Sequence, residues 1–444
     1  MLSNRTVTLA LTLTGLALGL AGPNPAGAAP SPVEQQIIEA IDRYEPEARA
    51  LLRQVVEINS GTQNFAGVEA VGEVLRDAFT GLGMETRWDD GAEFDRAGHL
   101  WAGIGDRGTR FLLIGHLDTV FASDSPFQGL TDLPEGDRWR GPGITDMKGG
   151  DVMMVFIIRA LQEVGVLADM SIQVVLTGDE ESRGKPHELA NRTLLDAARW
   201  ADIALGFEDG DGDPETAVIS RRGSVRWDLT VTGRPAHSSQ IFRPDVGYGA
   251  IFEAARILEA FRLELAGEPL LTFNPGVIVG GTDVTLDRTT SRGTAFGKAN
   301  VIARSLEIQG DIRAVSPTQL DAAKKTMQVI IAENLPGTEA TLSFASGYPP
   351  MAPTDQNRAL LTRYDAISQE LGFGAVRAVD PRRAGAADIS FAAGHVDMAL
   401  DGLGLMGYGG HTEGETALMK TFTRQMKRAA LLMYRLRNCG ECSR

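Results

Sequence analysis

The amino-acid sequence predicts an α/β protein with a mostly parallel sheet, interrupted by a small inserted domain of β-α-β-β-α-β order. The chain has 444 residues, which exceeds the usual size of one compact domain. Helical and strand-like patterns alternate from 32 to about 220, which is typical of βαβ units. From about 222 the pattern changes to the ferredoxin-like order of strands and helices.

The first part of the larger domain is expected at 31–221. Apolar residues at helical spacing predict its first helix, and short apolar or β-branched runs predict buried strands. The expected elements are a helix at 33–58, a strand at 111–115, a helix at 152–164, and strands at 171–177 and 203–207.

The inserted domain is expected at 222–348, and a polar stretch within it, 284–299, is expected to be an exposed loop. The second part of the larger domain is expected at 349–437. A tail at 438–444 contains Cys439 and Cys442, the only cysteines of the chain. A single C-x-x-C at a terminus is weak evidence for a metal or redox site, so no catalytic importance is expected of it. The elements expected in the inserted domain are strands at 224–233, 277–281, 304–313 and 338–344 and helices at 246–265 and 317–334.

The N-terminus has the pattern of an export signal. Arg5 precedes an apolar run at 7–21, and small residues follow at the A-x-A positions 26–28. The run is short for a membrane span and suits a signal peptide at 1–28, with an uncleaved anchor as the alternative. The mature protein is therefore expected in the periplasm or outside the cell, beginning near Ala29.

The composition excludes several kinds of partner. The net charge is -15, with 43% hydrophobic and 23% charged residues. A chain this acidic does not suit binding to nucleic acid or to an anionic membrane, both of which need a basic face. The expected partner is a small-molecule substrate.

Five short segments place histidine or acidic side chains just after strand-like runs or in Gly-rich turns. His116 and Asp118 are two positions apart, so their side chains can point the same way. In open α/β sheets, functional residues gather at the carboxyl ends of the strands, so we expect all five segments to converge there. The segments are 115–119, 141–149, 177–181, 206–209 and 407–412.

Two histidines and several carboxylates form a ligand set that suits Zn²⁺, with Mn²⁺ or Co²⁺ as alternatives. Two cations would also explain the crowding of carboxylates, which otherwise repel one another. Each segment alone is commonly structural or solvated. His99, His187 and His395 are interpreted as structural.

The ordered combination resembles the dizinc exopeptidases that include glutamate carboxypeptidase, the aminoacylases and succinyl-diaminopimelate desuccinylase. The resemblance extends from about 35 to 435. In that family the inserted domain serves as lid and dimerisation domain, so a homodimer with two zinc ions per chain is implied.

The resemblance implies a role for each site residue. His116 and Glu208 hold one zinc, Glu181 and His411 hold the other, and Asp146 bridges both. Met147 stands where the family often has a second acidic residue. Glu180 is implied as the general base and Asp118 as the residue that orients His116.

The resemblance also implies functional residues in the inserted domain. His237 corresponds to a histidine that stabilises the oxyanion in the partner subunit's site, although Ser238 and Ser239 replace the family's Ala and Gly. Asn300 and Arg313 correspond to positions around a substrate-carboxylate pocket. Arg382 or Arg383 is a further candidate for that pocket, and the sequence does not choose between them.

The implied reaction is hydrolysis of a peptide or amide bond. Two cations would lower the pKa of a bound water, and Glu180 would take the proton of that water and later deliver it to the leaving amine. A carboxypeptidase is the leading hypothesis and an N-acyl amino acid deacylase or amidohydrolase the second. A catalytically inactive binding homologue is a third hypothesis, which the complete set of site roles disfavours.

Overall fold

The computed structural model describes residues 29–439. The predicted signal peptide at 1–28 and Cys442 of the tail lie outside the described residues. None of the helices within 29–439 is long and apolar enough to cross a bilayer.

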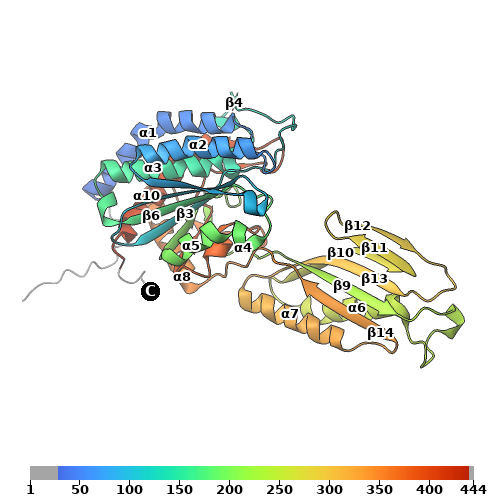
Figure 1. Cartoon of the computed structure of the whole chain (residues 1–444). Coiled ribbons are helices and arrows are strands. Elements are labelled where there is room, and N and C mark those ends of the chain that lie inside the picture. Colours follow the sequence, from blue (N-terminus) through green and yellow to red (C-terminus); the bar gives the residue numbers. More distant parts are fainter. Residues whose placement is uncertain (1–28, 440–444) are drawn as a thin grey trace, which may run out of the picture.

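A six-stranded mixed sheet forms the centre of the larger unit (Figure 1). β3 pairs in parallel with β6 and β7, and β7 pairs in parallel with β16. β2 runs antiparallel to both β1 and β6, so the parallel arrangement covers only part of the sheet. In sheet order the strands are β1 (Glu85–Asp90), β2 (Gly98–Ile104), β6 (Ser171–Thr177), β3 (Arg110–His116), β7 (Ile203–Gly206) and β16 (Met398–Leu400).

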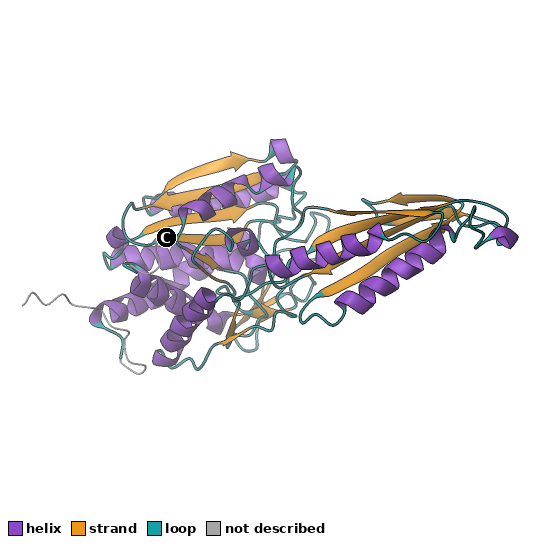
Figure 2. Cartoon of the chain, turned by 90° about the horizontal axis from the view of Figure 1, so that it is seen from below, coloured by secondary structure: helices purple, strands orange, loops and turns teal. Residues whose placement is uncertain are grey.

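Helices cover both faces of this sheet, as Figures 1 and 2 show. Along β3, Phe111 and Leu113 pack into the core on one face, and Leu112 and Ile114 into the core on the other. This burial on both sides explains the unbroken apolar run of the strand. On the face that carries Phe111 and Leu113 lie α1 (Pro32–Val56), α2 (Phe65–Gly81), α3 (Gly149–Glu163) and α10 (Phe422–Leu436). The other helices of this unit are α4 (His187–Ala190), α5 (Arg192–Trp200), α8 (Asp355–Glu370) and α9 (Ile389–Ala392).

The larger unit contains a second, small antiparallel sheet. Its strand order places β18 between β17 and β5, with β4 at the edge beyond β5. It thereby joins two regions far apart in the sequence. Its strands are β4 (Thr131–Leu133), β5 (Arg138–Arg140), β17 (Gly407–Tyr408) and β18 (Thr416–Leu418); a separate parallel pair consists of β8 (Thr216–Ala217) and β15 (Arg377–Ala378).

A second unit stands beside the first and contains a four-stranded antiparallel sheet in the order β10-β13-β9-β14 (Figure 1). Its chain order is β-α-β-β-α-β, and its core includes Trp227 and Phe261. That connectivity and strand order are ferredoxin-like. The elements are β9 (Val225–Gly233), α6 (Gly249–Leu265), β10 (Thr272–Gly281), β13 (Ser305–Arg313), α7 (Pro317–Ala332) and β14 (Thr338–Phe344).

The polar stretch predicted as a loop at 284–299 is instead largely a two-stranded ribbon of β11 (Asp283–Asp287) and β12 (Arg292–Phe296). The Asp287 carboxylate closes its turn by accepting the backbone N–H groups of Thr289 and Thr290. Arg288 then reaches back to Glu307 of β13 at 2.6 Å. The prediction was wrong because β12 is exposed along its whole length, and in β11 only Val284 and Leu286 alternate as half-buried residues, too short an apolar pattern to stand out in a polar stretch.

Two chain segments, 221–224 and 348–351, connect the two units, and we call them the connector. They pair with each other through the bridges Arg221–Met351 and Ser224–Tyr348. The backbone hydrogen bonds of both bridges are 3.0 Å long. The second unit is therefore attached at one end of its sheet, next to the first residue of β9.

Candidate metal centre

His116 ends β3, and its imidazole is buried where the strand leaves the core. Its Nδ1 donates to the carbonyl oxygen of Asp118 at 3.0 Å, which leaves the lone pair of Nε2 available. Nε2 lies 3.0 Å from Asp146 Oδ1 and 3.4 Å from Glu208 Oε1. These three side chains form one group of possible metal ligands.

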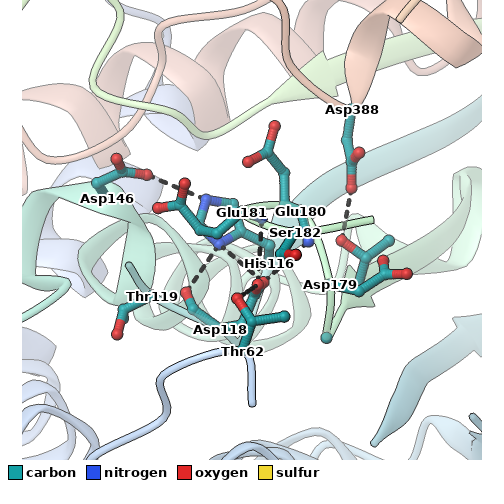
Figure 3. A network of polar contacts seen from close by, with 12 residues as sticks. Thr62, His116, Asp118, Thr119, Asp146, Asp179, Glu180, Glu181, Ser182 and Asp388 are labelled. Carbon is teal, nitrogen blue, oxygen red and sulfur yellow. Dashed lines mark hydrogen bonds and ion pairs between the residues drawn. The ribbon is translucent and has the colours of Figure 1, made fainter. Parts of the chain in front are cut away.

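A second group shares Asp146. His411 Nε2 lies 2.8 Å from the other carboxylate oxygen of Asp146 and 3.5 Å from Glu181 Oε1. The side chains of Asp146, Glu181 and His411 are again close enough to hold one ion. Asp146 therefore directs one oxygen to each group, and Figure 3 shows it beside His116 together with Glu180 and Glu181.

The geometry of both groups fits a cation. Donor atoms about 2.0–2.2 Å from a tetrahedral Zn²⁺ lie roughly 3.3–3.6 Å from one another. The measured separations, 2.8 to 3.5 Å, are close to this range. Glu181 Oε1 is moreover buried, and no group within residues 29–439 donates a hydrogen bond to it, as expected of an oxygen that ligates a metal.

The electrostatics of the site also favour cations. Burial raises the pKa of Glu181 to about 9, and the charge of Asp146 adds to the rise. Burial likewise raises the pKa of Glu180 and of Glu208 above their ordinary values. Bound cations would supply the positive charge that keeps these carboxylates ionised.

Asp118 contacts other groups of the site in addition to His116. Its carboxylate is fully buried and accepts hydrogen bonds from the Thr62 hydroxyl at 2.6 Å and from the backbone N–H groups of Glu180 and Glu181 at 3.0 and 3.1 Å. Oδ1 of Asp118 lies 3.5 Å from His116 Nδ1, whereas the backbone carbonyl oxygen of Asp118 lies 3.0 Å from the same nitrogen. Asp118 therefore anchors the loop that carries Glu180 and Glu181.

The expectation that all five segments lie at the carboxyl ends of the strands of one α/β sheet was wrong for Asp146 and His411. Asp146 lies between β5 and α3, in the turn Ile144–Lys148, and His411 follows β17. Both strands belong to the small antiparallel sheet. His116 ends β3 of the main sheet, and Glu180 and Glu208 follow β6 and β7 of that sheet. Two sheets therefore meet at the site.

Glu415 is a residue that sequence reasoning missed. Its buried carboxylate accepts backbone N–H groups of Gly143 at 2.9 Å, Thr145 at 2.8 Å and Asp146 at 3.2 Å. It thereby holds the Asp146 turn, and it lies four positions after His411. The sequence offers only that spacing as a signal, because Glu415 stands beside the exposed Glu413 in a polar turn.

His237, Asn300 and Arg313 lie in the second unit, and within residues 29–439 no hydrogen bond or ion pair joins them to the metal-ligand groups. The exposed His237 pairs with Val301, and Ser238 donates to the Asn300 carbonyl at 2.9 Å. His237 and Ser238 follow β9, and Asn300 and Val301 precede β13, so both segments lie at the end of the sheet away from the connector. Arg313 lies at the connector end of β13, with its guanidinium 3.1 Å from Asp311.

The late arginines form ion pairs with carboxylates that are not among the metal-ligand groups. Arg382 faces Asp380 at 3.9 Å, and Arg383 faces Asp211 at 3.1 Å. Both side chains are largely exposed. The buried Asp388 instead forms an ion pair with Arg183, a residue that the sequence did not single out.

Comparisons with known proteins agree with this geometry. Residues 112–436 match the model of Peptidase family M20/M25/M40. Carboxypeptidase G2 of Pseudomonas sp. strain RS-16 is 26% identical over 430 residues, which cover 95% of this chain and 97% of that protein. Succinyl-diaminopimelate desuccinylase of Rhodospirillum centenum is 30% identical over 239 residues, covering 50% of this chain and 58% of that enzyme.

Among solved structures, the Bacillus subtilis YXEP protein, a dinuclear metal binding peptidase from the M20 family, shares the fold. Its TM-score is 0.61 at 15% identity, and the match covers 89% of this chain and 99% of that one. The family model covers well over half of the sequence, and the structure groups histidines and carboxylates as a metallopeptidase needs. The chain belongs to peptidase family M20/M25/M40 and is a metallopeptidase-type hydrolase.

Proposed function

We propose that the protein is a dizinc hydrolase of carboxypeptidase type that releases a C-terminal residue from small peptides. The observation that carries this proposal is the position of Asp146, with one carboxylate oxygen facing His116 and the other facing His411. A carboxylate in that position can bridge two cations. The proposed ligands are His116 and Glu208 for one ion and Glu181 and His411 for the other, with Mn²⁺ or Co²⁺ as alternatives to Zn²⁺.

Glu180 is the proposed general base. Bound cations would activate water as a nucleophile and stabilise negative charge on the substrate. Glu180 is half-buried beside the ligand Glu181 and comes close to His116. It would take a proton from the attacking water and deliver it to the leaving amine nitrogen. Asp118 supports this role by holding the backbone N–H of Glu180.

A carboxypeptidase is favoured over a deacylase by the extent of the similarities. The likeness to carboxypeptidase G2 spans almost the whole of both chains, whereas the likeness to the desuccinylase spans half of this one. An N-acyl amino acid deacylase remains the second candidate, because both substrates carry a free carboxylate. Arg313 is the proposed partner for that carboxylate, since a guanidinium binds carboxylates in a fork.

We further propose that the active form is a homodimer in which His237 and Asn300 serve the partner's site. β9 starts at the connector and has nine residues, so its far end lies roughly 26 Å away. His237 follows that end, too far to reach the metal ligands of its own chain. Arg313 and Asn300 can therefore meet at one substrate only across a subunit boundary.

Exposed apolar side chains on the second unit offer a surface for that contact. Isolated exposed apolar residues are common, but neighbouring ones mark interaction surfaces. The rings of Phe242 and Phe252 lie 5.5 Å apart, and each side chain is at least half exposed. The exposed apolar residues of this unit are Phe242, Ile251, Phe252, Leu263, Ile278, Phe296 and Val329.

The proposed function is tested by a substrate screen with purified, zinc-loaded protein. Dipeptides with free C-termini, the same dipeptides amidated at the C-terminus, and N-acyl amino acids should be compared. A carboxypeptidase cleaves the free dipeptides and loses activity on the amides, whereas a deacylase prefers the N-acyl amino acids. No hydrolysis of any substrate by metal-loaded, folded protein contradicts the proposal and favours a binding homologue.

A further inference from the structure

Tyr348 belongs to the connector, but its side chain reaches the loop of the metal centre. Its backbone carbonyl accepts the N–H of Ser224 in the connector bridge. Its hydroxyl donates to the backbone carbonyl of Glu180 at 2.8 Å and accepts from Arg183 Nη2 at 3.1 Å. The phenol therefore uses both its donor and its acceptor capacity within the larger unit.

Arg183 gives this hydroxyl a rigid neighbour. Its side chain is only 5% exposed, and it forms ion pairs with Asp179 at 2.6 Å and with Asp388. The guanidinium also lies over the rings of Tyr348 and Phe391, at 5.5 and 5.4 Å from their centroids. Buried charge-assisted contacts of this kind hold side chains in a single arrangement.

The backbone at Glu180 is thus held from both sides. Asp118 accepts its N–H at 3.0 Å, and Tyr348 donates to its carbonyl oxygen at 2.8 Å. The same carbonyl belongs to the peptide bond between Glu180 and Glu181. Rotation of that peptide would move the proposed base and the proposed ligand together, so its orientation matters for both.

We propose that Tyr348 is a positioning residue for the catalytic base: from the connector, its hydroxyl fixes the peptide between Glu180 and Glu181. This inference rests on the proposed role of Glu180. It also gives the connector a part in catalysis, since the residue that holds the base stands at the junction of the two units.

The test is a double-mutant cycle of Tyr348→Phe and Glu180→Gln, with kcat, KM and bound metal measured for each variant. Tyr348→Phe keeps the ring and removes the hydroxyl, while Asp118 still accepts the N–H of Glu181 at 3.1 Å, so the fold and the metals should stay. We expect kcat to fall about 10- to 100-fold with KM nearly unchanged, because small misplacements of a catalytic group cost rates of this order. The double variant should be no slower than Glu180→Gln alone, because Asp118 still holds Glu181 and the rate effect of Tyr348 then passes through the base.

Tyr364→Phe is the matched control, since it also removes a single tyrosine hydroxyl, here one that donates to Gln425 Oε1 at 3.4 Å between α8 and α10. It should leave kcat unchanged. If Tyr348→Phe is as active as the parent, or if its loss adds fully to that of Glu180→Gln, Tyr348 does not position the base. If Glu180→Gln itself keeps full activity, the proposed base is wrong, and that outcome is distinct from a failure of Tyr348 alone.

Discussion

Glu415 holds Asp146 in place: its buried carboxylate accepts the backbone N–H of Asp146 at 3.2 Å, while the side chain of Asp146 faces both histidines of the metal centre. The two acidic residues therefore have different roles at the site. One orients the turn through its backbone, and the other presents its oxygens to the cations.

Removing the charge of Glu415 should therefore weaken metal binding. In Glu415→Gln one acceptor oxygen becomes an NH₂ group, which cannot accept the N–H groups of the Asp146 turn. We expect metal affinity to fall about 10- to 100-fold, as is usual when a group that orients a ligand is lost. Titration with Zn²⁺ against a competing chelator measures the change. Glu413→Gln, an exposed neighbour, should behave as the parent; equal affinities in both variants would mean that Glu415 is not needed to orient Asp146.

The dizinc proposal predicts how much metal the protein binds and that its activity depends on that metal. Purified protein should hold close to two divalent cations per chain, and removal by a chelator should abolish hydrolysis until metal is restored. Elemental analysis after mild dialysis gives the stoichiometry. A folded protein with intact His116 and His411 that holds no metal under these conditions is incompatible with the dizinc proposal.

Glu180 and its neighbour Glu181 should respond differently to the same substitution. Glu180→Gln should keep the metals and lose at least about 10²–10⁴-fold in turnover, the usual contribution of a general base. Glu181→Gln should lose metal as well as activity, because Glu181 is a proposed ligand. Parallel assays of kcat and of bound metal separate the two. Normal turnover in Glu180→Gln would require a different base.

Subunit complementation tests the proposed role of His237. His237→Ala and Glu180→Gln should each be inactive alone, but a mixed dimer contains one site with an intact Glu180 and an intact His237. Activity should return on mixing under conditions that exchange subunits. His187→Ala in place of His237→Ala is the control, since it should be active without mixing. If activity does not recover, although size-exclusion chromatography of tagged chains confirms the exchange, His237 acts within its own chain or has no catalytic role.

The ion pair between Glu34 of α1 and Arg435 of α10 should make the free energy of unfolding depend on pH. Burial alone would raise the pKa of Glu34, but hydrogen bonds from Arg435 and from Ser31 outweigh it and lower the pKa. A lowered pKa means that the contact stabilises the fold above the ordinary pKa of glutamate and is lost as the pH falls through the value in the folded state. Urea unfolding should show Glu34→Gln less stable than the parent at pH 7, with the gap shrinking toward pH 3. A gap that does not change with pH would exclude ionic stabilisation at Glu34.

Much of the local structure could be predicted from the sequence. The strands at 171–177 and 338–344 have the bounds expected from their β-branched or alternating residues, because such patterns report burial along a few neighbouring residues. The ribbon of β11 and β12 was missed, since β12 has no buried residue and the alternation in β11 covers only two half-buried apolar residues.

The sequence by itself determined the chemistry available to this protein, because the kinds of residue and their spacing decide which side chains can follow a strand and bind a metal. His116 and Glu180 could be found in this way, each beside the strand that carries it. Only the tertiary structure decided that Glu415 holds the Asp146 turn and that Tyr348 holds Glu180. Those contacts join residues separated by more than 160 positions, and no local pattern records which buried acceptor will meet which distant donor.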